Sequence, residues 1–108
     1  MIEKDIIEIF KALSVNSRIQ IIKLIKDNKL CVNAITNKLG ISQSAVSQHL
    51  KVLKECNLVV SDRYGSIIHY QLNKNKINEF KSAISKILDI ENNDWVKKIY
   101  VNILVSTN

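Results

Sequence analysis

Hydrogen-bonding side chains gather on one side of the stretch from Ile41 to Leu53 when it is read at helical spacing. Hydroxyl and amide groups both donate and accept hydrogen bonds, so such a side can contact base edges in a DNA major groove, and it can also bind phosphate oxygens. A solvated face of an ordinary bundle helix is the alternative, although such a face usually carries mostly Lys and Glu. The residues predicted to contact DNA here are Gln43, Ser44, Ser47, Gln48 and Lys51, with Gln43 at the margin.

The opposite side of the same stretch predicts how it is held. Val46, Leu50 and Leu53 recur at the spacing of one buried helical face. Ser42 is a favourable N-cap residue, because its hydroxyl can accept a hydrogen bond from a free amide of the first turn. We therefore expect a helix that begins after Ser42, buries one side and exposes the other.

A shorter helix is predicted just upstream, at residues 32–39, followed by Gly40 as a left-handed C-cap. Only Gly40 and Ile41 separate this helix from the Ser42 cap. A short helix, a turn containing Gly and a longer helix form the helix-turn-helix pattern.

A hairpin is predicted directly after the longer helix, which Asn57 can end in place of the usual Gly. Residues 58–64 and 67–72 are extended runs around a Gly-Ser pair, and apolar residues alternate with polar ones in the second run. A hairpin in this place is a wing. Arg63 is its best candidate for a phosphate or minor-groove contact, weighed evenly against a solvated hairpin charge.

The stretch from Phe10 to Asn73 resembles the ArsR/SmtB family of bacterial transcriptional repressors. FKALSVNSRIQIIKLI is similar to the family's opening helices, KLCVNAITNKLGISQSAVSQHLKVLKECNLV to its helix-turn-helix, and DRYGSIIHYQLN to its wing. The resemblance implies that the first helix and the helix after the wing pair across a two-fold axis. It also implies, in many members, a metal ion that lowers DNA affinity.

The metal sites implied by the resemblance lack residues in this sequence. Asn33 stands where metal sensors carry a second cysteine after Cys31, and thiophilic ions need two or more converging sulfur ligands. The family's other site uses Asp and His ligands on the helix after the wing, where neither His49 nor His69 lies. We therefore predict no metal site and no cofactor, and the inducer is open.

Cys31 and Cys56 are the two thiols of the chain, and both are predicted to be structural. A sharper alternative is a redox sensor, in which oxidation of an exposed thiol of lowered pKa distorts the DNA-reading helix. His49 flanks the buried face of that helix and is predicted to be buried and hydrogen-bonded, with DNA contact second and metal ligation third.

Apolar stripes near both ends predict a subunit contact. They lie on a first helix at residues 2–13, on a helix at 74–89 after the wing, and on a further helix at 94–105 around Trp95 and Tyr100. A small core cannot cover that much apolar surface, and large uncovered patches usually mark interfaces. The last helix is expected to reinforce a dimer or pack on its own subunit, in preference to lining a ligand pocket.

Bulk properties agree with a small nucleic-acid-binding protein. The chain has 108 residues and a net charge of +6, which favours a polyanionic partner. A Lys-rich composition is also common in proteins from AT-rich genomes, so the charge supports this interpretation without establishing it. The N-terminus has no signal-peptide pattern, and no segment has the apolar length of a membrane span. Two cysteines in a chain with no export signal suggest reduced thiols. A cytoplasmic location without membrane contact is expected.

Taken together, the sequence predicts a mainly helical winged helix-turn-helix in the order α-α-α-α-β-β-α, with a further C-terminal helix. We expect residues 1–108 to form one DNA-binding domain whose end helices dimerise, acting as a homodimeric repressor of a palindromic operator on double-stranded DNA. No Gly-rich phosphate loop or HExxH pattern supports an enzyme. A protein-interaction or general nucleic-acid-binding module is the main alternative, and a thiol-based redox-sensing repressor is the second.

Overall fold

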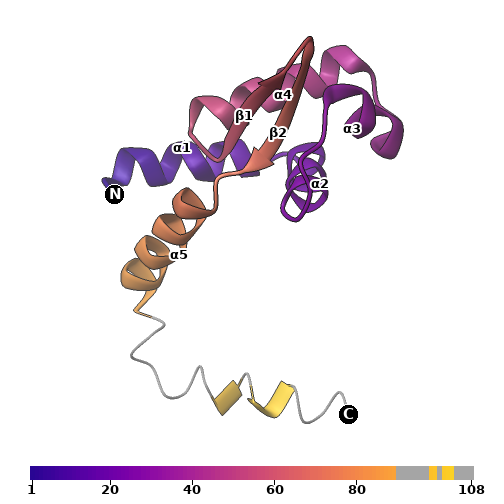
Figure 1. Cartoon of the computed structure of the whole chain (residues 1–108). Coiled ribbons are helices and arrows are strands. Elements are labelled where there is room, and N and C mark those ends of the chain that lie inside the picture. The colour runs from indigo at the N-terminus through magenta and orange to yellow at the C-terminus, as the bar shows by residue number, and fades with distance from the viewer. Residues whose placement is uncertain (90–97, 100, 104–108) are drawn as a thin grey trace.

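The computed structural model describes residues 1–89, 98–99 and 101–103, and its elements follow the predicted order (Figure 1). Residues 98–99 and 101–103 are helical, whereas the rest of the helix predicted at 94–105, with Trp95 and Tyr100, lies outside the described residues. The elements are α1 (Glu3–Leu13), α2 (Asn16–Ile25), α3 (Val32–Leu39), α4 (Gln43–Glu55), β1 (Val59–Tyr64), β2 (Ile67–Leu72) and α5 (Lys74–Leu88). The predicted fold class is confirmed.

Local backbone chemistry sets the helix boundaries. Gly40 ends α3 in the left-handed region at φ 69°, as predicted, because a residue without a Cβ enters that region at no steric cost. Asn57 follows α4 at φ 63°, which confirms that it replaces the usual Gly there. At the start of α5, the side chain of Asn73 accepts a hydrogen bond from the backbone amide of Lys76 at 3.2 Å.

One apolar cluster holds the helices and the base of the hairpin together. All of α1 to α4, together with the segment that enters β1, contribute side chains that are at most 2% exposed. Each such large side chain stabilises the fold by about 1.5–3 kcal/mol relative to leaving it in water. The described members are Ile9, Ala12, Ile21, Ile25, Ile35, Val46, Leu50, Leu53, Leu58 and Val59.

Strands β1 and β2 form the predicted antiparallel hairpin, with Val59 opposite Leu72 at its base and Tyr64 opposite Ile67 at its tip. A short bridge adds the segment before α3 to the sheet: Leu30 and Tyr70 exchange backbone hydrogen bonds of 3.0 and 2.8 Å. The predicted alternation of buried and open positions in β2 is wrong, because every residue from Ile68 to Leu72 is half-buried. Both faces of β2 are therefore partly covered.

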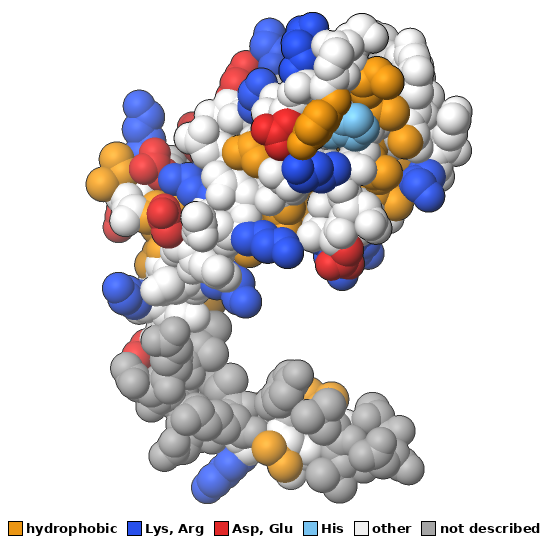
Figure 2. Space-filling view, viewed as in Figure 1, with side chains coloured by type: hydrophobic (Ala, Val, Ile, Leu, Met, Phe, Trp, Pro, Cys, Tyr) orange, Lys and Arg blue, Asp and Glu red, His pale blue; other side chains and the backbone are white. Residues whose placement is uncertain are grey.

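Helices α1 and α5 meet through aromatic rings but leave apolar side chains exposed. The rings of Phe10 and Phe80 contact edge to face, whereas no residue of α5 is fully buried. In Figure 2, exposed apolar side chains lie at the left, over the start of α1. Those more than half exposed on these helices or next to them are Ile2, Ile7, Phe10, Ile87 and Leu88.

None of the helices in the described part of the chain is both long enough and apolar enough to cross a bilayer.

Candidate nucleic-acid interface

Helix α4 is fixed by its buried side and by its first turn. Val46, Leu50 and Leu53 are at most 1% exposed and face the core formed with the neighbouring helices. The hydroxyl of Ser42 accepts a hydrogen bond from the backbone amide of Ala45 at 3.1 Å, which confirms the predicted N-cap. The helix is therefore presented as a rigid element.

The other side of α4 is open to solvent. Gln43, Ser44, Ser47, Gln48 and Lys51 are all exposed. Only Gln43 has a side chain engaged within the described part of the chain: its amide nitrogen donates to the side-chain oxygen of Asn33 on α3. The side chains of Ser44, Ser47, Gln48 and Lys51, and the side-chain carbonyl of Gln43, are therefore available to an external partner.

His49 lies between the two sides of α4. Its Nδ1 accepts a hydrogen bond from the Nε of Arg18 on α2 at 3.3 Å, which agrees with the predicted hydrogen bond, whereas the ring is half-buried and not buried as predicted. Burial lowers the pKa of His49 below its ordinary 6.5, and the charge of Arg18 lowers it further. The neutral form of the ring is therefore favoured at neutral pH.

The wing presents Arg63 near its tip. The side chain of Arg63 is exposed and has no hydrogen bond or ion pair with any described residue, so its charge is available to a phosphate. Gly65 turns the hairpin at φ 64° beside Tyr64, which is 54% exposed. These positions agree with either a DNA contact or a solvated hairpin charge.

Lys29 contacts the wing, which the sequence analysis did not predict. It lies before α3, yet its Nζ is 3.4 Å from a carboxylate oxygen of Asp62 and donates to the hydroxyl of Tyr64 at 3.2 Å. A second tie joins Lys54 on α4 to Ser61 on β1 at 2.8 Å. Lysines from two other segments thus contact side chains of β1, and these contacts depend on how the segments pack, which sequence spacing does not show.

The two cysteines lie at the ends of different helices. Cys56, which caps the end of α4, is half-buried, and its Sγ donates to the carbonyl of Leu53 at 3.4 Å. Burial raises the pKa of the Cys56 thiol above its ordinary 9.0. Cys31 is half-buried at the N-cap of α3. A raised pKa reduces the thiolate fraction at neutral pH, and this disfavours Cys56 as a redox sensor.

The residues around Cys31 do not fit the thiolate metal site that the resemblance implies. Asn33 supplies an amide in the second position, and its oxygen already accepts the hydrogen bond from Gln43. Among the residues that the structure describes, no three His, Cys, Asp or Glu side chains group in a way that could hold a metal ion.

The fold and this surface define a winged helix-turn-helix, and comparisons with known proteins identify the family. Residues 16–61 match the model of the bacterial regulatory protein family arsR. The HTH-type transcriptional regulator YbzH of Bacillus subtilis is 33% identical over 88 residues, which are 68% of this chain and 88% of that protein. The transcriptional repressor SmtB of Mycobacterium tuberculosis is 35% identical over 65 residues, which are 60% of this chain and 48% of that repressor.

Solved structures share the fold. An ArsR-like transcriptional regulator from Rhodococcus superposes with a TM-score of 0.75 at 22% identity, covering 94% of this chain and 92% of that one. The homodimeric winged helix-turn-helix DNA-binding domain Mb0332 of Mycobacterium bovis has a TM-score of 0.66 at 25% identity and covers 80% of each chain. The chain belongs to the ArsR family. It is a DNA-binding transcriptional regulator and, as a member of this family, not an enzyme.

Proposed function

We propose that this regulator is a homodimeric repressor that occupies a palindromic operator through α4 and the wing. The observation that carries the proposal is the exposed side of α4, where Ser44, Ser47 and Gln48 have no partner within the described residues although the helix beneath them is capped and buried. Hydrogen-bonding groups held on a rigid helix suit base-edge recognition, whereas Lys51 and Arg63 suit phosphates.

The two end helices support the homodimer. Ile7 is 51% exposed on α1 and Ile87 is 57% exposed on α5, and both are apolar side chains that a second copy would cover. The domain Mb0332, which shares the fold, is described as homodimeric. Residues 1–108 would then act as one domain with α1, α5 and the C-terminal helix as its dimerisation part.

A two-fold dimer dictates the form of the binding site. It places two α4 helices about one turn of DNA apart, roughly 34–36 Å, so the half-sites form an inverted repeat. Binding at such a site within a promoter excludes polymerase, and repression is the activity that the relative SmtB carries in its name.

The test is selection of bound duplexes from a random pool, followed by affinity measurements at several salt concentrations with a scrambled duplex as the control. We expect an enriched inverted repeat, and a slope of log affinity against log salt of about −0.9 for each phosphate contacted. Equal, weak binding of both duplexes would instead support a general nucleic-acid-binding or protein-interaction module. A promoter reporter carrying the enriched site distinguishes repression from activation.

Sedimentation tests the dimer separately. Ile7→Lys combined with Ile87→Lys is expected to yield monomers, because two charges would enter the apolar contact. Ile67→Lys on β2 is the matched control, since Ile67 is also 51% exposed but lies on the wing. A wild-type monomer at high concentration would remove the two-fold operator from the proposal.

A further inference from the structure

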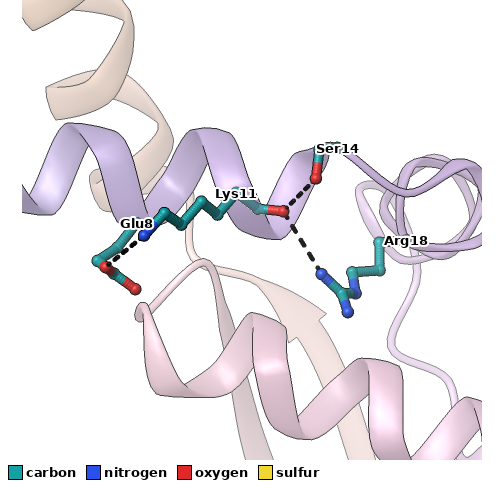
Figure 3. A network of polar contacts seen from close by, with 4 residues as sticks. All are labelled: Glu8, Lys11, Ser14 and Arg18. Atoms are coloured by element: carbon teal, nitrogen blue, oxygen red, sulfur yellow. Dashed lines mark hydrogen bonds and ion pairs between the residues drawn. The ribbon is translucent and has the colours of Figure 1, made fainter.

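One side chain, Arg18, joins α1, α2 and α4. Its Nη1 donates to the backbone carbonyl of Ala12 at 3.3 Å and to that of Lys11 at 3.5 Å, both in the last turn of α1. Its Nε donates to Nδ1 of His49 on α4 at 3.3 Å. Figure 3 shows the guanidinium extending from α2 toward the end of α1, where Ser14 donates to the same Lys11 carbonyl at 2.6 Å.

The end of α1 is a suitable anchor for this guanidinium. The last carbonyls of a helix lack intrahelical donors and carry the negative end of the helix dipole, so a cation that donates to them is stabilised. Arg18 is half-buried there, which limits its alternative positions. The guanidinium therefore fixes its Nε in the direction of α4.

The contact with His49 requires one protonation state. A guanidinium donates only, so Nδ1 must be the acceptor and the proton of the neutral ring must be on Nε2. His49 directly follows Gln48 and lies one turn before Leu53 of the core. A second proton on the imidazole would replace this hydrogen bond by two cations facing each other.

We propose that Arg18 and His49 are positioning residues that set the orientation of α4 relative to α1, and that protonation of His49 releases α4 and lowers its selectivity among DNA sequences. The inference rests on the proposed function, because it assumes that α4 reads bases. Base-edge hydrogen bonds need defined directions, whereas contacts of a flexible lysine with phosphate tolerate a displaced helix. Selectivity should therefore fall more than total affinity.

The charged groups near His49 agree with a proton-sensitive contact. Among the described residues, Arg18 of α2 is the charged group that acts electrostatically on His49. From α1, Glu8 and Lys11 line the same cavity of about 290 Å³ as Arg18, and they pair with each other at 3.8 Å. Lys38 of α3 and the charged residues of β1 are exposed. Burial and Arg18 together hold the pKa of His49 below 6.5, so acidification adds the proton.

Fluorescence anisotropy at constant ionic strength tests the proposal with the selected and the scrambled duplex, at about pH 7.5 and about pH 5.0, because the pKa of His49 lies below the ordinary histidine value. For the wild type, the ratio of the two affinities should fall at least about tenfold at the lower pH, as expected for the loss of one hydrogen bond to a charged group. His49→Gln keeps an acceptor without titrating, so it should keep the ratio at both pH values. His49→Leu should have the low ratio at both.

The control is His69→Gln, which removes the other histidine and should leave the wild-type pH response unchanged. Tighter binding of both duplexes at low pH would overturn the proposal, because His49 would then merely add positive charge. The same fall in His49→Gln would overturn it as well. If the wild type preferred no duplex at pH 7.5, the failure would lie with the proposed function.

Nitrogen-15 NMR of the histidine ring tests the contact between Arg18 and His49 in the free protein. We expect an unprotonated Nδ1 in His49 at neutral pH, and a shift of the Arg18 Nε–H resonance when the ring is protonated. A proton on Nδ1 at neutral pH, or an Arg18 resonance that does not respond, would contradict the inference.

Discussion

The ring of Phe10 on α1 meets the ring of Phe80 on α5 edge to face, with centroids 5.3 Å apart and planes at 74°. Such pairs contribute about 0.5–1.5 kcal/mol beyond the area they bury. Because no residue of α5 is fully buried, this ring contact is a main attachment of the helix to its own subunit. It joins the two helices that carry the proposed subunit contact.

The ring contact predicts an energetic coupling between Phe10 and Phe80. In a double-mutant cycle with Phe10→Leu and Phe80→Leu, we expect a coupling of about 0.5–1.5 kcal/mol in the free energy of unfolding by urea. A cycle of Phe10→Leu with Ile67→Ala on the wing is the control and should show no coupling. Additive effects of the two phenylalanines would contradict the contact.

The cap of α4 predicts a loss of stability in Ser42→Ala. The amide of Ala45 would lose its acceptor, which costs about 1 kcal/mol of unfolding free energy. Urea denaturation measures the change. Ser44→Ala removes a hydroxyl from the first turn of the same helix but has no such bond, so its stability should change by a few tenths of a kcal/mol at most.

Gln48 and Lys51 are predicted to act differently on DNA. Gln48→Ala should relax base preference and cost about 1–3 kcal/mol on the selected duplex. Lys51→Ala should weaken all duplexes alike and reduce the salt slope by about 1. Binding isotherms on selected and scrambled duplexes at several salt concentrations measure both. If Lys51→Ala changed the sequence preference while Gln48→Ala did not, the two roles would be reversed.

The raised pKa of Cys56 predicts slow modification of its thiol. In a Cys31→Ala background, iodoacetamide should label native Cys56 more slowly at pH 8 than the same residue unfolded in urea, because burial keeps the thiol protonated. Mass spectrometry follows the rate.

The same shift has a consequence for stability. The unfolded thiol ionises first as pH rises above 9.0, so the contribution of Cys56 to stability is present below that pH and is lost as pH rises through the folded pKa. Cys56→Ala should lack this part of the alkaline loss. Rapid labelling of the native thiol, or lower DNA affinity after mild peroxide treatment, would favour the redox-sensing alternative.

Features that depend on neighbouring residues could be predicted from the sequence. The cap at Ser42, the left-handed Gly40 and the left-handed Asn57 follow from backbone chemistry within a few residues. The exposed side of α4 follows from helical periodicity around Val46, Leu50 and Leu53. The sequence was therefore sufficient for the position of the candidate interface.

Features that depend on distant segments could not be predicted. The alternation expected in β2 is absent, and two contacts of this strand involve residues outside it: Leu30 pairs with Tyr70, and the ring centroid of Tyr64 lies 5.3 Å from that of His69. The ties from Lys29 to Asp62 and from Arg18 to His49 join residues far apart in the chain. Such contacts require the angles between packed elements, which periodicity does not supply.

The bridge between Leu30 and Tyr70 joins the hairpin to the segment that enters α3. Leu30 is followed directly by Cys31, the N-cap of α3, so the bridge links the wing to the start of the helix-turn-helix. In the proposed complex, the distance between α4 and the hairpin tip would therefore be fixed before DNA is bound. The DNA would have to bend or narrow a groove to match this distance. The affinity for each sequence would then depend on its stiffness, even at base pairs that no side chain contacts.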